Sequence, residues 1–188
     1  MDQLLNKLKE TAAFLKNEGI KNPEVCIVLG TGLGAFADKI KIEKQIAYSD
    51  IPNFPVATVE FHKGQLSYGT IGDKKVLAMQ GRFHYYEGYS MEQITFPIRV
   101  MKELGATFLL LSNAARGINK KFKKGDLGLI KDHINLNPDN PLRGLNEPEV
   151  GNRFVDMSQP YDPILNKHLK TSARALKIKM RNRAPRKL

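Results

Sequence analysis

The sequence predicts an α/β fold in which a central mixed β-sheet is flanked by helices. Three observations predict it. Leucines and alanines recur at three- and four-residue spacing over residues 4–15, a short apolar run over 24–29 leads into a glycine-rich turn, and a second apolar run over 107–112 stops at Asn113. The first is the stripe of an amphipathic helix, and the other two are typical of buried strands. Helices alternating with strands in 188 residues, 41% of them hydrophobic, favour one layered domain.

The chain is expected to open with a helix, a buried strand and a tight turn. The helix ends near Gly19, and the strand leads into the turn Gly30-Thr31-Gly32-Leu33-Gly34, where glycine permits the geometry. A further helix is expected after it. Cys26 is the one cysteine; it has no partner for an internal disulfide and is predicted to be a small buried hydrophobe within the strand.

A hairpin is predicted next. Residues 66–71 and 75–79 are strand-like and flank Gly72-Asp73, a turn sequence that favours antiparallel pairing.

A capped helix follows the hairpin. Ser90 and Gln93 have the spacing of a capping box, and apolar residues then recur at helical spacing up to Gly105. Pro97 should kink or delay this helix.

The second half of the chain is less regular. The almost continuous apolar run over 107–112 predicts a strand covered on both faces. Residues 126–130 resemble another strand, and residues 135–156 are dense in Pro, Gly and Asn, which predicts a long irregular loop. A helix is expected over 163–176, with no further strand after it.

The net charge of +11 is unevenly distributed. Residues 171–188 hold 7 of the 30 Lys and Arg residues and none of the 19 Asp and Glu residues, and Pro185 would stop a helix there. Residues 1–175 are therefore predicted to be the domain, and 176–188 a basic tail foreign to the fold. A solvated or disordered tail is the commoner explanation of such a run, although it could bind RNA or an acidic surface.

The glycine turn is the first candidate site. Glycine lets backbone N–H groups approach an anion, and Thr31 adds a hydroxyl donor. A dinucleotide fingerprint is satisfied only loosely, because Asp50 does not end an apolar strand. A purely structural turn is the alternative.

Residues 81–89 contain the densest set of candidate side chains. Arg82 offers a planar fork of donors suited to phosphate, and His84 could donate to the same oxyanion. The alternative is that both are solvated and that the nearby tyrosines pack against a loop. His62 is a third possible phosphate donor, although a His beside a Lys is usually a surface residue.

Residues 113–117 follow a buried strand, where open α/β sheets bind ligands. The small side chains of Ala114 and Ala115 would let backbone N–H groups contact a ligand closely, and a simple strand-to-loop transition is the alternative. His133 and Asn135 lie in a predicted loop, and their spacing assigns them no role. The sequence has no Cys/His spacing typical of a metal site.

Read in order, several segments resemble motifs of the trimeric purine-nucleoside phosphorylase family, the inosine-guanosine phosphorylases. They are Leu29-Gly30-Thr31-Gly32-Leu33-Gly34, Gly81-Arg82-Phe83-His84-Tyr85-Tyr86-Glu87-Gly88-Tyr89, Thr95-Phe96-Pro97, Asn113-Ala114-Ala115, Gly125-Asp126, Asp132-His133-Ile134-Asn135 and Asn140-Pro141-Leu142-Arg143-Gly144. The similarity covers about residues 1–175 and implies a nucleoside phosphorylase-like sheet.

The resemblance implies a reaction in which inorganic phosphate attacks the anomeric carbon of a purine ribonucleoside, such as inosine or guanosine. The products are free base and ribose 1-phosphate, and no metal or organic cofactor takes part. It also implies a cytoplasmic homotrimer that acts in purine salvage. Cationic donors suit this chemistry, because they orient a phosphate dianion that can stabilise positive charge developing on the sugar.

The resemblance also implies roles for individual residues. The catalytic residue would be His84, Tyr86 would face the ribose, and Phe154 would cap the site of a neighbouring subunit. The phosphate site would be formed by Thr31, His62, Arg82, His84 and the backbone at Ala114.

Two features depart from the family pattern. Arg116 stands where the family usually has a second glycine after Asn-Ala-Ala, which puts a bulky cation beside the phosphate loop. The chain also ends where the family continues into the strands and helices that hold its base-binding residues. We therefore expect a C-terminally truncated phosphorylase with little or no turnover and an exposed apolar sheet edge.

Other interpretations remain. One is a catalytically inactive phosphate-binding remnant or a regulatory partner of a phosphorylase. A nucleic-acid-binding module using residues 171–188 is much less favoured, as is a phosphorylase acting on methylthioadenosine, because residues 82–89 resemble the inosine-guanosine group more closely. The apolar runs are far shorter than the ~20 residues that span a bilayer, so no membrane partner and a cytoplasmic location are expected.

Overall fold

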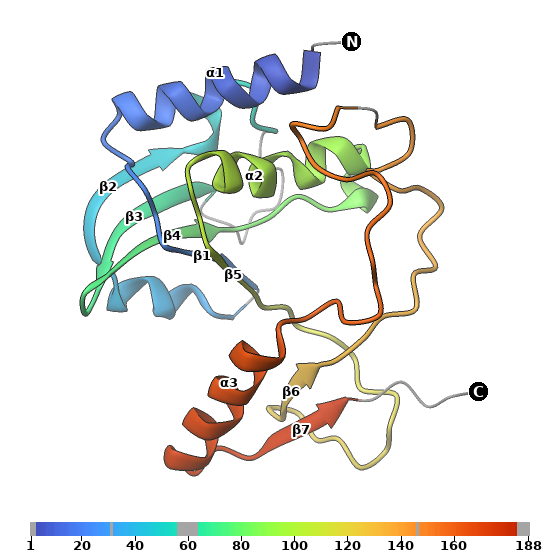
Figure 1. Ribbon diagram of the computed structural model, residues 1–188. Coiled ribbons are helices and arrows are strands. Elements are labelled where there is room, and N and C mark those ends of the chain that lie inside the picture. Colours follow the sequence, from blue (N-terminus) through green and yellow to red (C-terminus); the bar gives the residue numbers. More distant parts are fainter. Residues whose placement is uncertain (1–2, 31, 56–63, 146, 184–188) are drawn as a thin grey trace. The chain divides into compact units, whose positions relative to one another are not determined.

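A computed structural model of the chain describes residues 3–30, 32–55, 64–145 and 147–183. The chain divides into two compact units (Figure 1). Unit 1 comprises Met1–Ala114 and Arg143–Gly151, and unit 2 comprises Ala115–Leu142 and Asn152–Leu188. Each helix of the described part is too short or too polar to cross a membrane.

Unit 1 is built on a five-stranded mixed sheet in the order β2-β3-β4-β1-β5. The strands are β1 (Val25–Leu29), β2 (Lys41–Ala47), β3 (Gln65–Ile71), β4 (Lys74–Gln80) and β5 (Phe108–Leu111). β1 pairs in parallel with β4 and β5, whereas β3 pairs antiparallel with both β2 and β4. The predicted mixed sheet and its hairpin are therefore confirmed.

Helical segments cover both faces of this sheet. They are α1 (Gln3–Asn17), α2 (Met91–Glu103) and the 3₁₀ helices η1 (Gly34–Lys39), η2 (Tyr48–Asp50) and η3 (Tyr85–Glu87). Figure 1 shows α1 and α2 on one face and η1, in light blue, on the other. Because side chains alternate along a strand, Ile27 and Leu29 of β1 pack with Ala37 of η1 in one buried cluster.

The start of α2 has the predicted capping box. The Ser90 hydroxyl accepts from the Gln93 amide at 3.2 Å, and the Gln93 side chain accepts from the Ser90 amide at 2.9 Å. Pro97 lies buried within α2, and the helix continues beyond it to Glu103, so the proline does not end the helix.

β5 differs from the strand covered on both faces that its apolar run predicts. Leu109 is 38% exposed and Leu111 is 60% exposed. β5 is an edge strand, since among the described strands it pairs only with β1. Leu109 and Leu111 alternate along the strand and so share one face, and the described residues leave that face partly uncovered. This strand therefore forms the exposed apolar edge that the sequence analysis also expected.

Unit 2 contains β6 (Leu127–Ile130), α3 (Pro163–Ala175) and β7 (Met180–Arg183). β6 and β7 pair in parallel, so the expectation of no strand after the last helix is wrong. The sequence Met-Arg-Asn-Arg has no apolar alternation, and the strand forms by pairing with β6. Between β6 and α3 the described residues form turns, bends and irregular backbone, as predicted for 135–156.

Candidate phosphate-binding site

Three parallel strands of unit 1 end at the same edge of the sheet. Leu29, at the end of β1, is in register with Gln80, at the end of β4, and Val28 is in register with Leu111, at the end of β5. The segments that follow these strands begin with Gly30, Gly81 and Ser112. Ligands of α/β sheets bind at such edges, so the predicted glycine turn and Arg82 are brought to a suitable place.

Ser112 connects all three segments. Its hydroxyl donates to the Val28 carbonyl at 3.0 Å and accepts from the Gly30 amide at 2.9 Å. Its own carbonyl accepts from Nη2 of Arg82 at 2.7 Å. One residue thus fixes both the start of the glycine turn and the guanidinium.

Gly30 is required at its position because of how closely Arg82 approaches. A Cβ on Gly30 would lie 2.7 Å from Nη2 of Arg82, 2.8 Å from the Ser112 carbonyl oxygen and 3.0 Å from Cα of Asn113. The glycine therefore admits the guanidinium. The Gly30 amide donates to the Ser112 hydroxyl, so Gly30 does not supply the free backbone amide for an anion that the sequence predicts in this turn.

The turn that carries Arg82 is anchored by buried aromatic residues. Phe83 is 3% exposed and packs against Tyr48 and Tyr89, at ring-centroid distances of 5.3 and 5.6 Å. The buried Tyr48 hydroxyl donates to the Gly81 carbonyl at 2.9 Å. In extended backbone, neighbouring side chains point to opposite sides, so burying Phe83 turns Arg82 and His84 away from the core.

The electrostatics of Arg82 are those of a half-buried cation. Burial lowers the pKa of its guanidinium, and the nearby Tyr86 acts in the opposite direction. A guanidinium stays protonated under such shifts, so Arg82 presents a charged fork of donors at the strand ends.

His84 is held at one edge of its ring by Glu87 and on a face by Tyr86. Its Nδ1 contacts the carboxylate of Glu87, whose side chain is only 5% exposed. The ring stacks on Tyr86 with centroids 4.8 Å apart and planes inclined by 22°. Tyr86 itself is 77% exposed. The structure thus brings Arg82, His84 and Tyr86 together on one turn.

Sequence reasoning missed Ser112 and Glu87. Ser112 stands at the end of an apolar run, and no local pattern links it to Gly30 or to Arg82, which are 82 and 30 positions away in the chain. Glu87 offered a weak signal, because a residue three positions after His84 lies beside it on a helical turn such as η3.

The remaining candidates lie outside the described residues, at the end of a stretch of unit 1, or in unit 2. Thr31 and His62 lie outside the described residues, and Ala114, which is exposed, is the last residue of its stretch of unit 1. Arg116 and Phe154 belong to unit 2 and are exposed, Phe154 by 87%.

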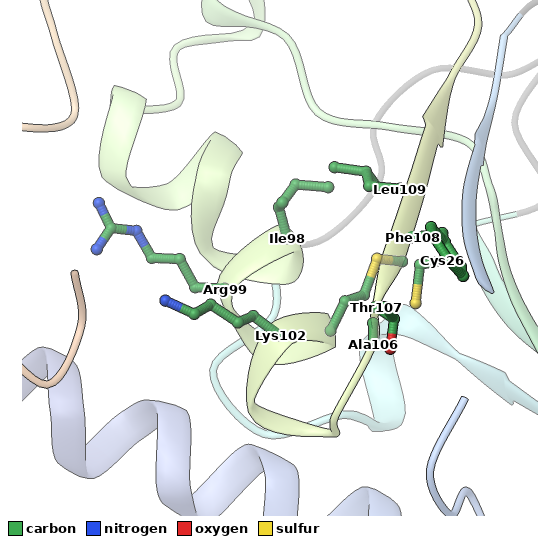
Figure 2. Close-up of a pocket in the computed structure, with 9 residues that line it drawn as sticks. Cys26, Ile98, Arg99, Lys102, Ala106, Thr107, Phe108 and Leu109 are labelled. Carbon is green, nitrogen blue, oxygen red and sulfur yellow. The ribbon is translucent and has the colours of Figure 1, made fainter. Parts of the chain in front are cut away.

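A cavity of about 260 Å³ lies elsewhere in unit 1 (Figure 2). Its walls come from α2 and from the start of β5, at the opposite end of that strand from Ser112, and Cys26 of β1 also lines it. Cys26 is fully buried as predicted, and burial raises the pKa of its thiol to about 12. In the described part of the chain, no group of His, Cys, Asp and Glu side chains is arranged to hold a metal ion.

The chain is similar to known phosphorylases. Residues 24–183 match the family described as the Phosphorylase superfamily. Purine nucleoside phosphorylase 1 of Bacillus subtilis is 50% identical over 173 residues, which are 92% of this chain and 64% of that protein. Purine nucleoside phosphorylase of Rattus norvegicus is 45% identical over 157 residues, 82% of this chain and 54% of that protein.

Solved structures agree with the sequence comparison. Isoform 2 of purine nucleoside phosphorylase from Schistosoma mansoni, in complex with cytosine and ribose-1-phosphate, superposes with a TM-score of 0.87 at 42% identity. The alignment covers 94% of this chain and 64% of that one. The chain therefore spans less than two thirds of the length of the curated relatives it matches.

Proposed function

We propose that the Arg82 site binds inorganic phosphate, because the chain belongs to the phosphorylase superfamily. We further propose that the site serves the phosphorolysis of purine ribonucleosides such as inosine and guanosine to free base and ribose 1-phosphate. Similarity to purine nucleoside phosphorylases supports the reaction. The observation that carries phosphate binding is the charged guanidinium held by the Ser112 carbonyl where three parallel strands end.

The arrangement suits phosphate because its donors are fixed before the ligand arrives. Arg82 is positioned by Ser112 and by the space that Gly30 leaves. His84 is positioned by Glu87 and Tyr86. When the ring is protonated, Nδ1 can donate to Glu87 while Nε2 donates to a phosphate oxygen. Fixed donors cost little reorganisation, so they hold the nucleophile in a reactive orientation.

The remaining roles belong to the same proposal. Thr31, His62 and the backbone at Ala114 would complete the phosphate site, and His84 would be the catalytic residue. The exposed Tyr86 ring would face the ribose, where a nucleoside could pack on it. Phosphate would be a co-substrate, with no metal or organic cofactor.

Phe154 would cap the site of a neighbouring subunit in a cytoplasmic homotrimer. Its ring is 87% exposed in the single chain, which fits a contact that another subunit provides. Size-exclusion chromatography with light scattering tests the trimer.

A second candidate is a phosphate-binding chain without turnover, acting alone or as a regulatory partner of a phosphorylase. It is favoured by the composition of the described site, which supplies donors for an anion and no group assigned to the purine base.

The experiment incubates the purified chain with inosine and phosphate, beside a phosphate-free control, and follows hypoxanthine release. Phosphate-dependent release that Arg82→Gln abolishes supports phosphorolysis by this chain. Saturable phosphate binding without release supports the second candidate. Neither binding nor release from a folded sample contradicts both.

A further inference from the structure

The net positive charge of the protein is confined to one of its two units. Unit 1 contains 14 Lys and Arg residues and 14 Asp and Glu residues, so its formal net charge is zero. Unit 2 contains 16 Lys and Arg residues and only 5 Asp residues, so it carries the whole net charge of +11. The excess therefore extends well beyond residues 171–188, to which the sequence analysis assigned most of it.

The five aspartates of unit 2 accept hydrogen bonds from backbone amides. The carboxylates of Asp132, Asp139 and Asp156 each accept from an amide one or two residues further on, at 2.8 Å. Asp162 caps α3 by accepting from the amides of Ile164 and Leu165, and Asp126 accepts from the Lys123 amide. These aspartates hold turns and caps, and Asp126 also pairs with Arg181.

Seven of the 16 basic residues of unit 2 form two groups in which all but the half-buried Lys170 are exposed. One is the loop Lys120-Lys121-Phe122-Lys123-Lys124, whose four lysines are all exposed. The other follows α3, where Lys167, Lys170 and Arg174 are spaced by three and four residues and so share one face. α3 contains no acidic residue.

An aromatic ring is exposed in the same unit. Phe154 is 87% exposed, and the guanidinium of Arg153 lies 5.6 Å from its ring centroid. Unpaired bases stack on exposed rings, and stacking beside an Arg is favourable because of the cation.

We propose that unit 2 binds single-stranded nucleic acid through its phosphates, with Phe154 as a stacking platform for a base. A single strand fits better than an acidic protein, because it offers regularly spaced phosphates to the two basic groups together with free bases for the ring. The phosphate contacts of this proposal do not involve the Arg82 site, which lies in the neutral unit. Phe154 is the ring that the trimer proposal assigns to a neighbouring subunit's site, so base stacking on it requires a chain in which no other subunit covers the ring.

The test uses the full chain and a fluorescent 20-nucleotide poly-U strand, with anisotropy measured between 50 and 200 mM NaCl. We expect saturable binding whose affinity falls steeply with salt, with a log–log slope of about −3 if roughly four phosphates are neutralised. The variant Lys167→Gln, Lys170→Gln, Arg174→Gln should weaken binding on the order of tenfold and flatten the slope by about 2. Phe154→Ala should weaken it about fivefold or more with the slope unchanged.

The matched control removes the same charge from unit 1. Lys9, Lys16 and Lys21 are exposed, and changing all three to Gln lowers the net charge as much as the α3 variant does. We expect this control to bind poly-U within about twofold of the parent chain. Lys120, Lys121, Lys123 and Lys124 changed together to Gln provide a second test in a loop, should the α3 variant fail to fold.

Several outcomes would overturn the proposal. Equal weakening by the unit 1 control and the unit 2 variants would attribute binding to net charge alone. Absence of binding at 50 mM NaCl would refute it outright. Tighter binding to polyglutamate or to phosphatidylserine vesicles than to poly-U would assign the surface to an acidic protein or a membrane.

Discussion

Substituting Gly30 by alanine should weaken phosphate binding by displacing Arg82. The new Cβ would lie 2.7 Å from Nη2 of Arg82 and 2.8 Å from the Ser112 carbonyl oxygen. Ser112 cannot retreat easily, because its amide and hydroxyl both bind the Val28 carbonyl. The flexible Arg82 side chain should therefore move and lose its 2.7 Å bond to Ser112.

The size of the effect follows from the interactions lost. Overpacking of this kind costs about 1–3 kcal/mol of folding free energy. A hydrogen bond to a charged group contributes about 1.5–3 kcal/mol, so misplacing the guanidinium should weaken phosphate affinity by about 10- to 150-fold. Isothermal titration of phosphate and urea unfolding measure the two quantities.

Gly34→Ala is the matched control for stability. Nothing lies within 4 Å of a Cβ at Gly34, and its backbone is not left-handed, so the free energy of unfolding should stay within about 0.5 kcal/mol of the parent value or rise slightly. If Gly30→Ala binds phosphate within twofold of the parent chain, the close approach of Arg82 to Gly30 has no part in binding and the reasoning is refuted.

Three further predictions concern single side chains. Ser112→Ala leaves the Gly30 amide without its acceptor and should lower the free energy of unfolding, measured by urea unfolding, by about 1–3 kcal/mol. An unchanged midpoint of the urea transition would contradict this role of the hydroxyl. Glu87→Gln keeps the shape of the side chain but weakens its bond to His84, so phosphate affinity should fall by about three- to tenfold by calorimetry, whereas equal affinity would show that His84 needs no carboxylate. The Cys26 thiol has a pKa of 9.0 in the unfolded chain and of about 12 in the folded protein. Its contribution to the free energy of unfolding is therefore complete below pH 9 and falls by about 1.4 kcal/mol per pH unit as the pH rises from 9 towards 12. Cys26→Ala should remove that part of the alkaline destabilisation, and parallel pH profiles for the two chains would contradict the assignment.

The elements of unit 1 could be predicted because local patterns match the burial they produce. The stripe over 4–15 becomes the buried face of α1, and the run over 24–29 becomes β1. The capping box at Ser90 also forms as predicted, since it depends only on residues within one helical turn.

The errors arose where neighbours distant in sequence decide the structure. The run over 107–112 carries no sign that β5 is the strand at the edge, pairing among the described strands with β1 alone, so the exposed apolar edge that the resemblance implied could not be assigned to it from local pattern. β7 forms because β6 offers an edge, although Met180–Arg183 has no strand pattern of its own.

The site shows the same division. Arg82 and His84 could be predicted from their residue types after a strand, and the glycine turn from its composition. That Gly30 makes room for a guanidinium, and that Ser112 holds it, depends on contacts 30 to 82 residues apart in the chain.

Calorimetric titration of inorganic phosphate into the parent chain and into Arg82→Gln tests the central claim most directly, with urea unfolding of both chains measured alongside. The account predicts saturable binding to the parent chain and at least about tenfold weaker binding to a variant that still folds. Equal phosphate affinity in the two folded chains would contradict the assignment of this site.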